Sequence, residues 1–239
     1  MAFKRKPPPG SARRVISLGN NFRGVTTNKR GRLVQFESEQ ERKLVLLLEH
    51  DPTVADYISQ PETLRFCDGS GRKRHYTPDF KVWRTNGHIE LHEVTLEARR
   101  QERGAIRERE AAARAICQQR GWSYIVHTDQ TLPSGYEHAN MNFLAAFRAS
   151  EYTSAACTRF WLEQLAGCEM VHPRTALNQA KSGLLVGELF NALYHQLWHG
   201  VVQMDWQRPF IWQGDFHSEA RIWLPITPTS TTQMQGVRS

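Results

Sequence analysis

Two runs of alternating polar and apolar residues, 76–83 and 88–95, flank the dipeptide Asn86-Gly87. Alternation with a period of two predicts β-strands, and Asn-Gly between two such runs predicts a β-hairpin. This hairpin constrains the fold strongly because its register decides which side chains share a face of the sheet. Both strands carry acidic residues, so the register also decides whether those acids meet.

The length of the loop sets the distance between Asp79 and Glu93. A two-residue turn, Asn86-Gly87, places Asp79 opposite Val94 and on the other side of the sheet from Glu93. A three-residue loop that starts at Thr85 places Asp79 directly opposite Glu93, with Gly87 suited to the left-handed position of the bulge. A shared acidic site therefore predicts the three-residue loop or an equivalent bulge.

Glu93 continues an apolar row of its strand, where a carboxylate is costly unless it is paired, metal-bound or at the rim of the sheet. Opposed residues have Cβ atoms about 5 Å apart, so two carboxylates there repel each other unless a cation lies between them. Oxygen-rich clusters of this kind suit Mg²⁺, with Mn²⁺ as a substitute. A third carboxylate could come from a helix on which Glu37 and Glu41 lie one turn apart. The alternative interpretation makes Asp79 a polar residue at a strand start and Glu93 an exposed residue at an edge.

Helices and strands alternate along the first 150 residues. Ser38 and Glu41 have the spacing of a capping box, which predicts a helix that begins there and ends near residues 50–52. A short strand is expected at 32–36, further strands at 54–59, 63–66 and 122–127, and helices at 96–120, with Gly104 as the weak point, and at 139–147. This order is typical of a mixed α/β layer.

The composition changes near residue 150, where charged residues become sparse and five of the seven tryptophans follow. Helices are predicted at 155–165, 174–181 and 184–199, the last with a leucine at every fourth position from Leu185 to Leu197 as its core stripe. A small β-hairpin is predicted from 201–205 and 209–212. Three helices and a hairpin suggest a winged-helix-like module, and the Thr/Ser/Gln-rich residues 227–239 suggest a disordered tail.

The positive charge is concentrated at the start of the chain. The net charge is +7, yet the first 36 residues contain nine basic residues and no acidic one. Such a basic arm is typical of segments that bind nucleic-acid phosphates, and a solubilising terminus is the alternative. The candidate DNA-binding residues are Lys4, Arg5, Lys6, Arg13, Arg14, Arg23, Lys29, Arg30 and Arg32. We therefore divide the chain into an arm (1–34), a catalytic domain (35–150), a partner-binding domain (151–226) and a tail (227–239).

No apolar run approaches the ~20 residues that a membrane-spanning helix needs. No apolar segment follows the basic start, as one would in a signal peptide. The sequence thus predicts a cytoplasmic, nucleoid-associated protein without a membrane partner.

The ordered set of motifs resembles a known family. Pro78-Asp79 followed by Glu93-Val94-Thr95 resembles the PD-(D/E)xK nuclease superfamily. Together with Glu41, the 46–49 segment, Asp51-Pro52, Gln60-Pro61 and the 76–80 segment, it is similar to TnsA, the endonuclease subunit of heteromeric transposases. The strong part of the resemblance covers residues 35–130, and the C-terminal part is more loosely similar to that family's second domain.

The resemblance implies a restriction-endonuclease-like mixed sheet with flanking helices, plus a mainly helical winged-helix-like C-terminal domain. It implies that Glu41, Asp79 and Glu93 bind the catalytic divalent metal, together with the backbone carbonyl of Val94. The implied reaction is metal-assisted hydrolysis of phosphodiesters at the 5′ ends of a transposon. The implied partners are the transposon-end DNA, a TnsB-like recombinase that handles the 3′ ends, and a TnsC-like ATPase that docks on the second domain.

One position departs from the family. The family has lysine two residues after the second acid, and this chain has Thr95 there. Lysine at that position orients the attacking water and offsets charge. Lys81 follows Asp79 by two residues on the same strand face and could replace that lysine. Two alternatives stay open: a cleavage-deficient DNA-binding adaptor of the same fold, and a stand-alone PD-(D/E)xK nuclease.

Overall fold

A computed structural model describes residues 23–149, 151, 153–178 and 183–225. The chain divides into two compact units, Met1–His138 and Ala139–Ser239. The boundary between the two units lies between residues 138 and 139, inside the helix Gly135–Leu144, whereas the predicted boundary is at residue 150. Five candidate DNA-binding residues and the predicted tail lie outside the described residues: Lys4, Arg5, Lys6, Arg13, Arg14 and 227–239.

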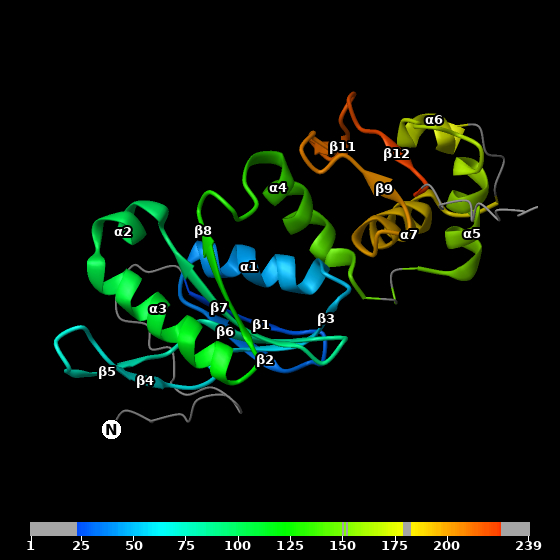
Figure 1. Cartoon of the computed structure of the whole chain (residues 1–239). Helices are drawn as coiled ribbons and strands as arrows, with labels where there is room; N and C mark the ends of the chain where they lie inside the picture. The colour runs from blue at the N-terminus through cyan, green and yellow to red at the C-terminus, as the bar shows by residue number, and fades with distance from the viewer. Residues whose placement is uncertain (1–22, 150, 152, 179–182, 226–239) are drawn as a thin grey trace, which may run out of the picture. The chain divides into compact units, whose positions relative to one another are not determined.

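A four-stranded mixed sheet forms the centre of the first unit (Figure 1). Its order is β3-β6-β7-β8, with antiparallel pairs except for the parallel pair β7-β8. The strands are β3 (Val54–Ser59), β6 (Phe80–Arg84), β7 (Ile89–Thr95) and β8 (Ser123–Thr128). This arrangement confirms the predicted mixed α/β layer and is consistent with a restriction-endonuclease-like fold.

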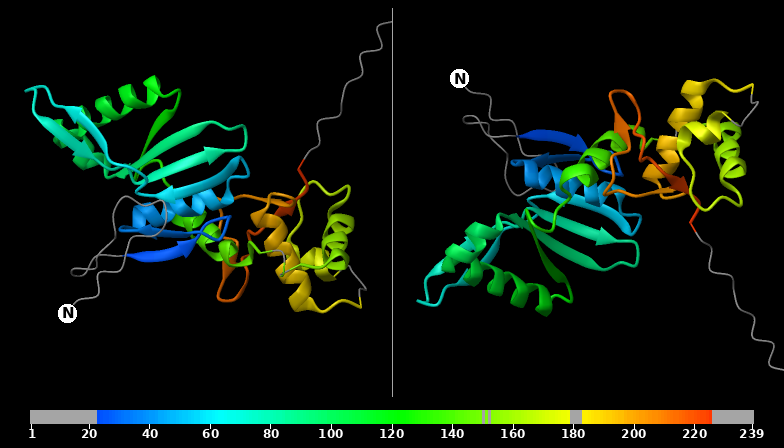
Figure 2. Two further views of the ribbon diagram at one scale, coloured as in Figure 1. Left: turned by 90° about the horizontal axis from the view of Figure 1, so that it is seen from below. Right: turned by 90° about the horizontal axis from the view of Figure 1, so that it is seen from above.

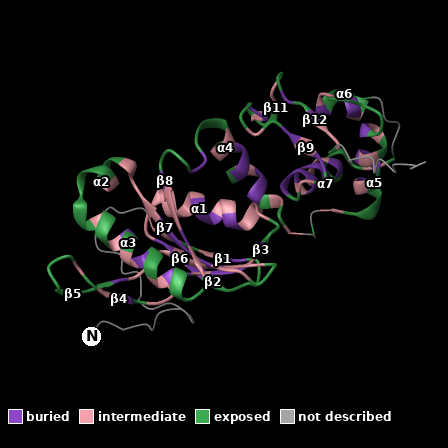
Figure 3. Cartoon of the chain, viewed as in Figure 1, coloured by how far each residue is buried: buried purple, intermediate pink, exposed green. Residues whose placement is uncertain are grey.

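Helices cover both faces of this sheet, because alternate strand residues are apolar on each side. Helix α1 (Glu39–His50) packs Leu44, Val45 and Leu48 onto one face, against Phe80 and Val82. Helix α3 (Gly104–Gln119) packs onto the other face through a cluster that includes fully buried Leu91. Both helices have a buried inner side and an exposed or partly exposed outer side (Figure 3).

The loop between β6 and β7 is the three-residue loop that a shared acidic site requires. Phe80 pairs with His92 and Trp83 with Ile89, so opposed residues sum to 172 along the hairpin. Gly87 adopts a φ of 84°, in the left-handed region where glycine is at ease. In this register, position 79 lies opposite position 93.

The predicted arm includes folded structure. Strands β1 (Gly24–Thr27) and β2 (Leu33–Phe36) form an antiparallel hairpin, and Val34 is fully buried in the core under α1. Asn28, in the connecting turn, donates from its amide to Asp56 and to the Tyr57 carbonyl, each at 2.7 Å. The predicted boundary at residue 34 therefore falls inside a strand that belongs to the body.

A second two-stranded hairpin, β4 (Leu64–Cys67) with β5 (Lys73–Tyr76), extends beside α3 (Figure 2). Leu64 and Tyr76 join the core cluster of α3 and anchor its base. The helix predicted over 96–120 is interrupted just before Gly104: α2 (Glu97–Glu102) ends at Arg103, whose extended backbone separates it from α3.

The second unit is mainly helical. It contains α5 (Ala155–Leu165), α6 (Pro173–Asn178), α7 (Val186–Trp198), most of α4 (Gly135–Leu144) and the short turn η1 (Ala145–Phe147). Helix α7 is largely buried (Figure 3), and Leu189, Leu193 and Leu197 form its core stripe, as predicted. Leu185 precedes the helix as its N-cap and is 68% exposed, so it does not belong to that stripe.

The hairpin predicted from 201–205 and 209–212 is wrong. Strand β9 (Gln203–Met204) pairs with β12 (Ile222–Trp223), and β10 (Ile211–Trp212) pairs with β11 (Asp215–Phe216). Each of these strands has two residues, too few for alternation to reveal its partner. The winged-helix interpretation of this unit stays a prediction. Among the described residues, none of the helices has the length and apolar character to cross a membrane.

Candidate active site

Asp79 immediately precedes β6 and is held by main-chain contacts on both sides. Its carbonyl accepts a hydrogen bond from the Gln60 N–H at 2.6 Å, and its carboxylate accepts one from the Val94 N–H at 2.8 Å. The second bond fixes the side chain of Asp79 over the end of β7. Asp79 is half-buried, and it faces the strand position that carries Glu93.

Glu93 lies on β7 and is 5% exposed. Its carboxylate accepts hydrogen bonds from the Tyr76 hydroxyl and from the Arg109 guanidinium of α3. The Arg109 guanidinium also lies over the Tyr76 ring, 4.5 Å from the ring centre, and the Tyr76 hydroxyl is 3.0 Å from that of Tyr124. Glu93 is thus a buried carboxylate with a cation and a hydroxyl on it, not an exposed edge residue.

Glu41 comes from the first turn of α1 and closes a capping box. Its N–H donates to the Ser38 hydroxyl oxygen at 3.1 Å, and its carboxylate accepts from the Ser38 hydroxyl and the Glu37 N–H at 2.9 Å each. Burial and the charge of Asp79 raise the pKa of Glu41 to about 7. The charge of Asp79 therefore acts on the Glu41 carboxylate, although the hydrogen bonds of that carboxylate are made at the start of its own helix.

The three carboxylates destabilise one another's charged forms. Burial, followed by the charge of Glu93, raises the pKa of Asp79 well above its usual range. Burial also raises the pKa of Glu93, against the opposing effect of Arg109. Such mutual repulsion is relieved by a divalent cation, and carboxylate oxygens are the ligands that Mg²⁺ prefers.

The donor set fits a magnesium ion in its chemistry, but the described residues are not arranged as a complete metal cage. No three His, Cys, Asp or Glu side chains within the described ranges are grouped closely enough to hold an ion as they stand. The charge of Glu93 acts on Asp79, and each oxygen of Glu41 already accepts a hydrogen bond, one from Ser38 and one from Glu37.

A depression of about 360 Å³ opens onto this region. Glu41 and Val94 line it, together with Thr95 at the position where the sequence departs from the family pattern. Arg99 from α2 also lines the depression. The acidic region is therefore open to a ligand from this side.

Lys81 lies elsewhere. Its ammonium is 3.7 Å from a Glu62 carboxylate oxygen and lies over the Trp122 ring, 3.9 Å from the ring centre. Its side chain is directed toward that pair rather than toward Asp79 and Glu93. The cation that reaches the acidic cluster is Arg109, at the charge-assisted bond to Glu93.

Sequence reasoning gave no role to Arg109 and included Tyr76 only as part of the 76–80 motif. Arg109 lies in α3, which begins after the break at Arg103, and no local sequence pattern pairs it with β7. Tyr76 precedes the Thr77-Pro78-Asp79 motif by one residue, and its place at the end of a strand was the available signal. Arg100 forms bonds to Glu110 at 2.8 and 3.0 Å, a structural ion pair.

The described members of the predicted DNA-binding set lie in or next to the β1–β2 hairpin. Arg32 is 3.2 Å from Asp56, and Lys29 donates to the carbonyls of Asp51 and Val54. Arg30 is 4.0 Å from Asp56, and Arg23 precedes β1. These contacts attach the hairpin to β3, a structural role that sequence reasoning did not foresee.

The strands of the central sheet lie in a part of the chain that matches a known family. Residues 51–129 match the family model described as TnsA-like endonuclease N terminal. This stretch of the chain is a TnsA-like endonuclease domain. The match covers β3 to the end of β8 and includes Asp79, Glu93, Val94 and Arg109, whereas Glu41 lies ahead of it. A comparison with curated proteins found no match. The match is consistent with a TnsA-like endonuclease, as the resemblance implied.

Proposed function

We propose that this chain is a metal-dependent DNA endonuclease subunit of a Tn7-type transposase that hydrolyses phosphodiesters at the 5′ ends of the transposon. The observation that supports this proposal is the pairing of Asp79 with Glu93 across the β6–β7 hairpin inside a TnsA-like domain. The proposal includes a TnsB-like recombinase for the 3′ ends and a TnsC-like ATPase that docks on the second unit.

In this function Asp79, Glu93, Glu41 and the Val94 carbonyl would hold Mg²⁺. A bound Mg²⁺ supplies an activated water and offsets the negative charge that develops on the phosphodiester. Other residues of the chain hold these carboxylates in position. The Val94 N–H orients Asp79, and Arg109 and Tyr76 hold Glu93 in one rotamer.

Thr95 cannot provide the cation that the family's lysine provides. Arg109 is a permanent cation that is bonded to Glu93, and burial does not remove its charge because the pKa of Arg109 is raised by Glu93 despite desolvation. We include Arg109 as the residue that offsets charge at the site and keep Lys81 as the alternative. Undiminished nicking by Lys81→Ala eliminates that alternative.

The test is a nicking assay on transposon-end DNA with Mg²⁺ or Mn²⁺, together with calorimetric titration of Mn²⁺. We expect Asp79→Asn to lower nicking at least 100-fold and to weaken Mn²⁺ binding. The control is Asp215→Asn, because Asp215 is an exposed carboxylate of the second unit, and it should change neither quantity. Equal Mn²⁺ affinity in wild type and Asp79→Asn contradicts the proposed site.

A cleavage-deficient adaptor is the second candidate function, and Thr95 is the observation that favours it. If the wild type binds DNA but does not nick it, alone or with its partners, the adaptor function is correct. In that case Thr95→Lys should restore nicking, because it returns the missing cation to the acidic cluster.

A further inference from the structure

The β4–β5 hairpin presents one cationic face that the active site does not use. Arg65 pairs with His75 across the hairpin, and Cys67 pairs with Lys73. All four side chains are exposed and share a face, because Leu64 and Tyr76 occupy the alternate positions and are buried against α3. The core thus holds one face of the hairpin and leaves the other to solvent.

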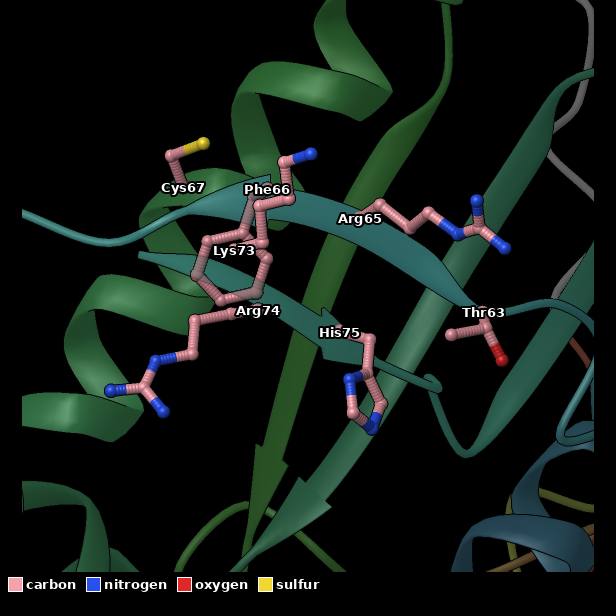
Figure 4. A pocket seen from close by; sticks show the side chains of 7 residues that line it. All are labelled: Thr63, Arg65, Phe66, Cys67, Lys73, Arg74 and His75. Carbon is pink, nitrogen blue, oxygen red and sulfur yellow. The ribbon is translucent and has the colours of Figure 1, made fainter. Parts of the chain in front are cut away.

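This face borders a depression of about 740 Å³. Figure 4 shows Arg65, Lys73 and His75 from the two strands around it, with Thr63 at the base of β4. A concave surface of this size admits a chain of phosphates rather than a single small anion. Its charged rim comes from strands, whose backbones are held by the hairpin ladder.

The acid of the hairpin does not neutralise this face. Asp68 is the sole acidic residue between positions 63 and 76. Its carboxylate accepts from Ser70 and from the Arg72 N–H in the turn, and it pairs with Arg74 at 2.8 Å. Within the part of the chain that the structure describes, neither Arg65 nor Lys73 has an ion-pair partner.

The hairpin leads directly into the acidic cluster. Tyr76, the last residue of β5, donates to Glu93, and Asp79 follows three residues later. Lys73 precedes Tyr76 by three residues in β5, a rise of about 10 Å along the strand. A groove of about 380 Å³ is lined by Arg74, Arg103 and Arg109 together with the acidic residues Asp68 and Glu108, and Arg109 also bonds to Glu93.

We propose that Arg65, Lys73 and His75 on the outer face of the β4–β5 hairpin bind the phosphates of the duplex DNA that the acidic cluster cleaves. This inference rests on the proposed endonuclease function for the position of the cut, and on charge complementarity for the ligand. Phosphate contacts of this kind position the duplex without reading its sequence. The hairpin would therefore set where the backbone lies relative to Asp79.

The first test uses the natural cysteines of the full chain. Cys67 lies opposite Lys73 on the proposed face, and Cys168, in the second unit, is also exposed and free. We expect a 20-base-pair duplex to slow alkylation of Cys67 by a maleimide at least fivefold and to leave Cys168 unchanged. Equal rates at Cys67 with and without duplex overturn the proposal.

The second test measures duplex affinity against salt concentration by fluorescence anisotropy, with a chelator present to prevent cleavage. Arg65→Gln/Lys73→Gln should lower the slope of log K against log salt by about 1.8, because each phosphate contact contributes about 0.9. The matched control is Arg159→Gln/Arg208→Gln, which removes two exposed charges from the second unit. An equal decrease of the slope in both double variants overturns the proposal. It is also overturned if Arg65→Gln/Lys73→Gln weakens binding of single-stranded RNA but leaves the slope for duplex DNA unchanged.

Nicking by the same variants separates this proposal from the proposed function. If Asp79→Asn abolishes nicking while the hairpin variants keep the wild-type salt slope, the hairpin proposal fails and the endonuclease stands. If the wild type does not nick but the hairpin variants lose slope, the endonuclease proposal fails and the hairpin site stands.

Discussion

Asp79 is a carboxylate whose charged form is destabilised in the folded protein, although it accepts a hydrogen bond from the Val94 N–H. Its pKa is raised by burial and by Glu93, so its ionised form destabilises the folded state at neutral pH. Groups of this kind are retained at functional sites at the expense of stability.

We therefore predict that Asp79→Asn raises the melting temperature while it removes nicking. The amide oxygen of asparagine can still accept from the Val94 N–H, so only the repulsion is lost. Relief of about 1 kcal/mol corresponds to an increase of about 2–4 °C for a chain of this size. Thermal unfolding with a chelator present measures it, and a lower melting temperature would show that Asp79 contributes more to folding than its repulsion costs.

Arg109 and Glu93 form a partly buried ion pair whose members differ in exposure, 29% for the arginine side chain and 6% for the glutamate. We predict that Arg109→Ala lowers the free energy of unfolding by about 3 kcal/mol, because it leaves Glu93 buried without its cation. The double variant with Glu93→Gln should recover most of this loss. Denaturant unfolding of the four proteins in the cycle gives the coupling, and additive losses would contradict a direct pair.

At this scale the sequence predicts the register only on a condition: a shared acidic site needs the three-residue loop that starts at Thr85, and a two-residue turn is the alternative. The structure has the three-residue loop. The sequence was not sufficient to find Arg109. Arg109 lies in α3, after the interruption of the helix at Arg103. No local sequence pattern predicts that α3 packs close to β7.

Among the elements, the β6–β7 loop controls the site most directly. Gly87 has a positive φ, and no atom lies within 4 Å of the position that a Cβ would take, so a side chain there meets backbone strain alone. We predict that Gly87→Ala costs about 1–2 kcal/mol of stability. Gly104→Ala is the control, because the same open space surrounds a helical glycine, and it should be neutral or stabilising by about 0.5 kcal/mol. Denaturant unfolding measures both, and equal effects would contradict the loop assignment.

The sheet also contains a histidine pair that makes its stability depend on pH. His127 of β8 is 3.0 Å from His92 of β7, and burial, with the charge of His92, lowers the pKa of His127 to about 4. The unfolded chain takes up a proton near pH 6.5, before the folded one does, so stability falls as the pH drops through this window.

We predict that His127 accounts for about 1 kcal/mol of stability lost between pH 7.5 and 5.5. The measurement is the difference in unfolding free energy between these two pH values, for wild type and His127→Asn with a chelator present. The variant should lose less than the wild type. An identical loss would assign the pH dependence to other groups.

Most elements of the first unit follow from patterns of six or more residues, and these were predictable: β3 was predicted with its observed bounds, Val54–Ser59. The two-residue strands of the second unit were not, because β9 finds its partner 18 positions away at β12. Pairing of such short strands is decided by the core around fully buried Val202 and Ile222 rather than by local sequence.

For the whole molecule, the positive charge is concentrated at the start of the chain, and we predict that this charge binds DNA. The basic start of the chain is in two parts, because Lys29 and Arg32 hold the β1–β2 hairpin onto β3. The five basic residues before position 23 lie outside the described residues, and we keep them as predicted DNA-binding residues.

We predict that deletion of residues 1–22 lowers the salt slope of DNA binding by up to about 4.5, or 0.9 for each of five basic residues. Deletion of residues 1–30 should also lower the melting temperature, because it removes β1 and the bonds of Asn28 to Asp56 and Tyr57. Anisotropy and thermal unfolding of both truncations separate the two effects. An unchanged slope after the shorter deletion would reduce that segment to a solubilising terminus.

The carboxylate of Glu41 has two roles: it caps the start of α1, and in the proposed function it is also a metal ligand. Both oxygens of Glu41 accept from the turn that starts the helix, one from Ser38 and one from Glu37. A metal ion bound by Glu41 would draw electron density from the same two oxygens, and we predict that filling the site weakens their bonds to Ser38 and Glu37. Metal occupancy could then be measured as faster hydrogen exchange at the Glu37 amide, which donates to Glu41, even when no DNA is cut.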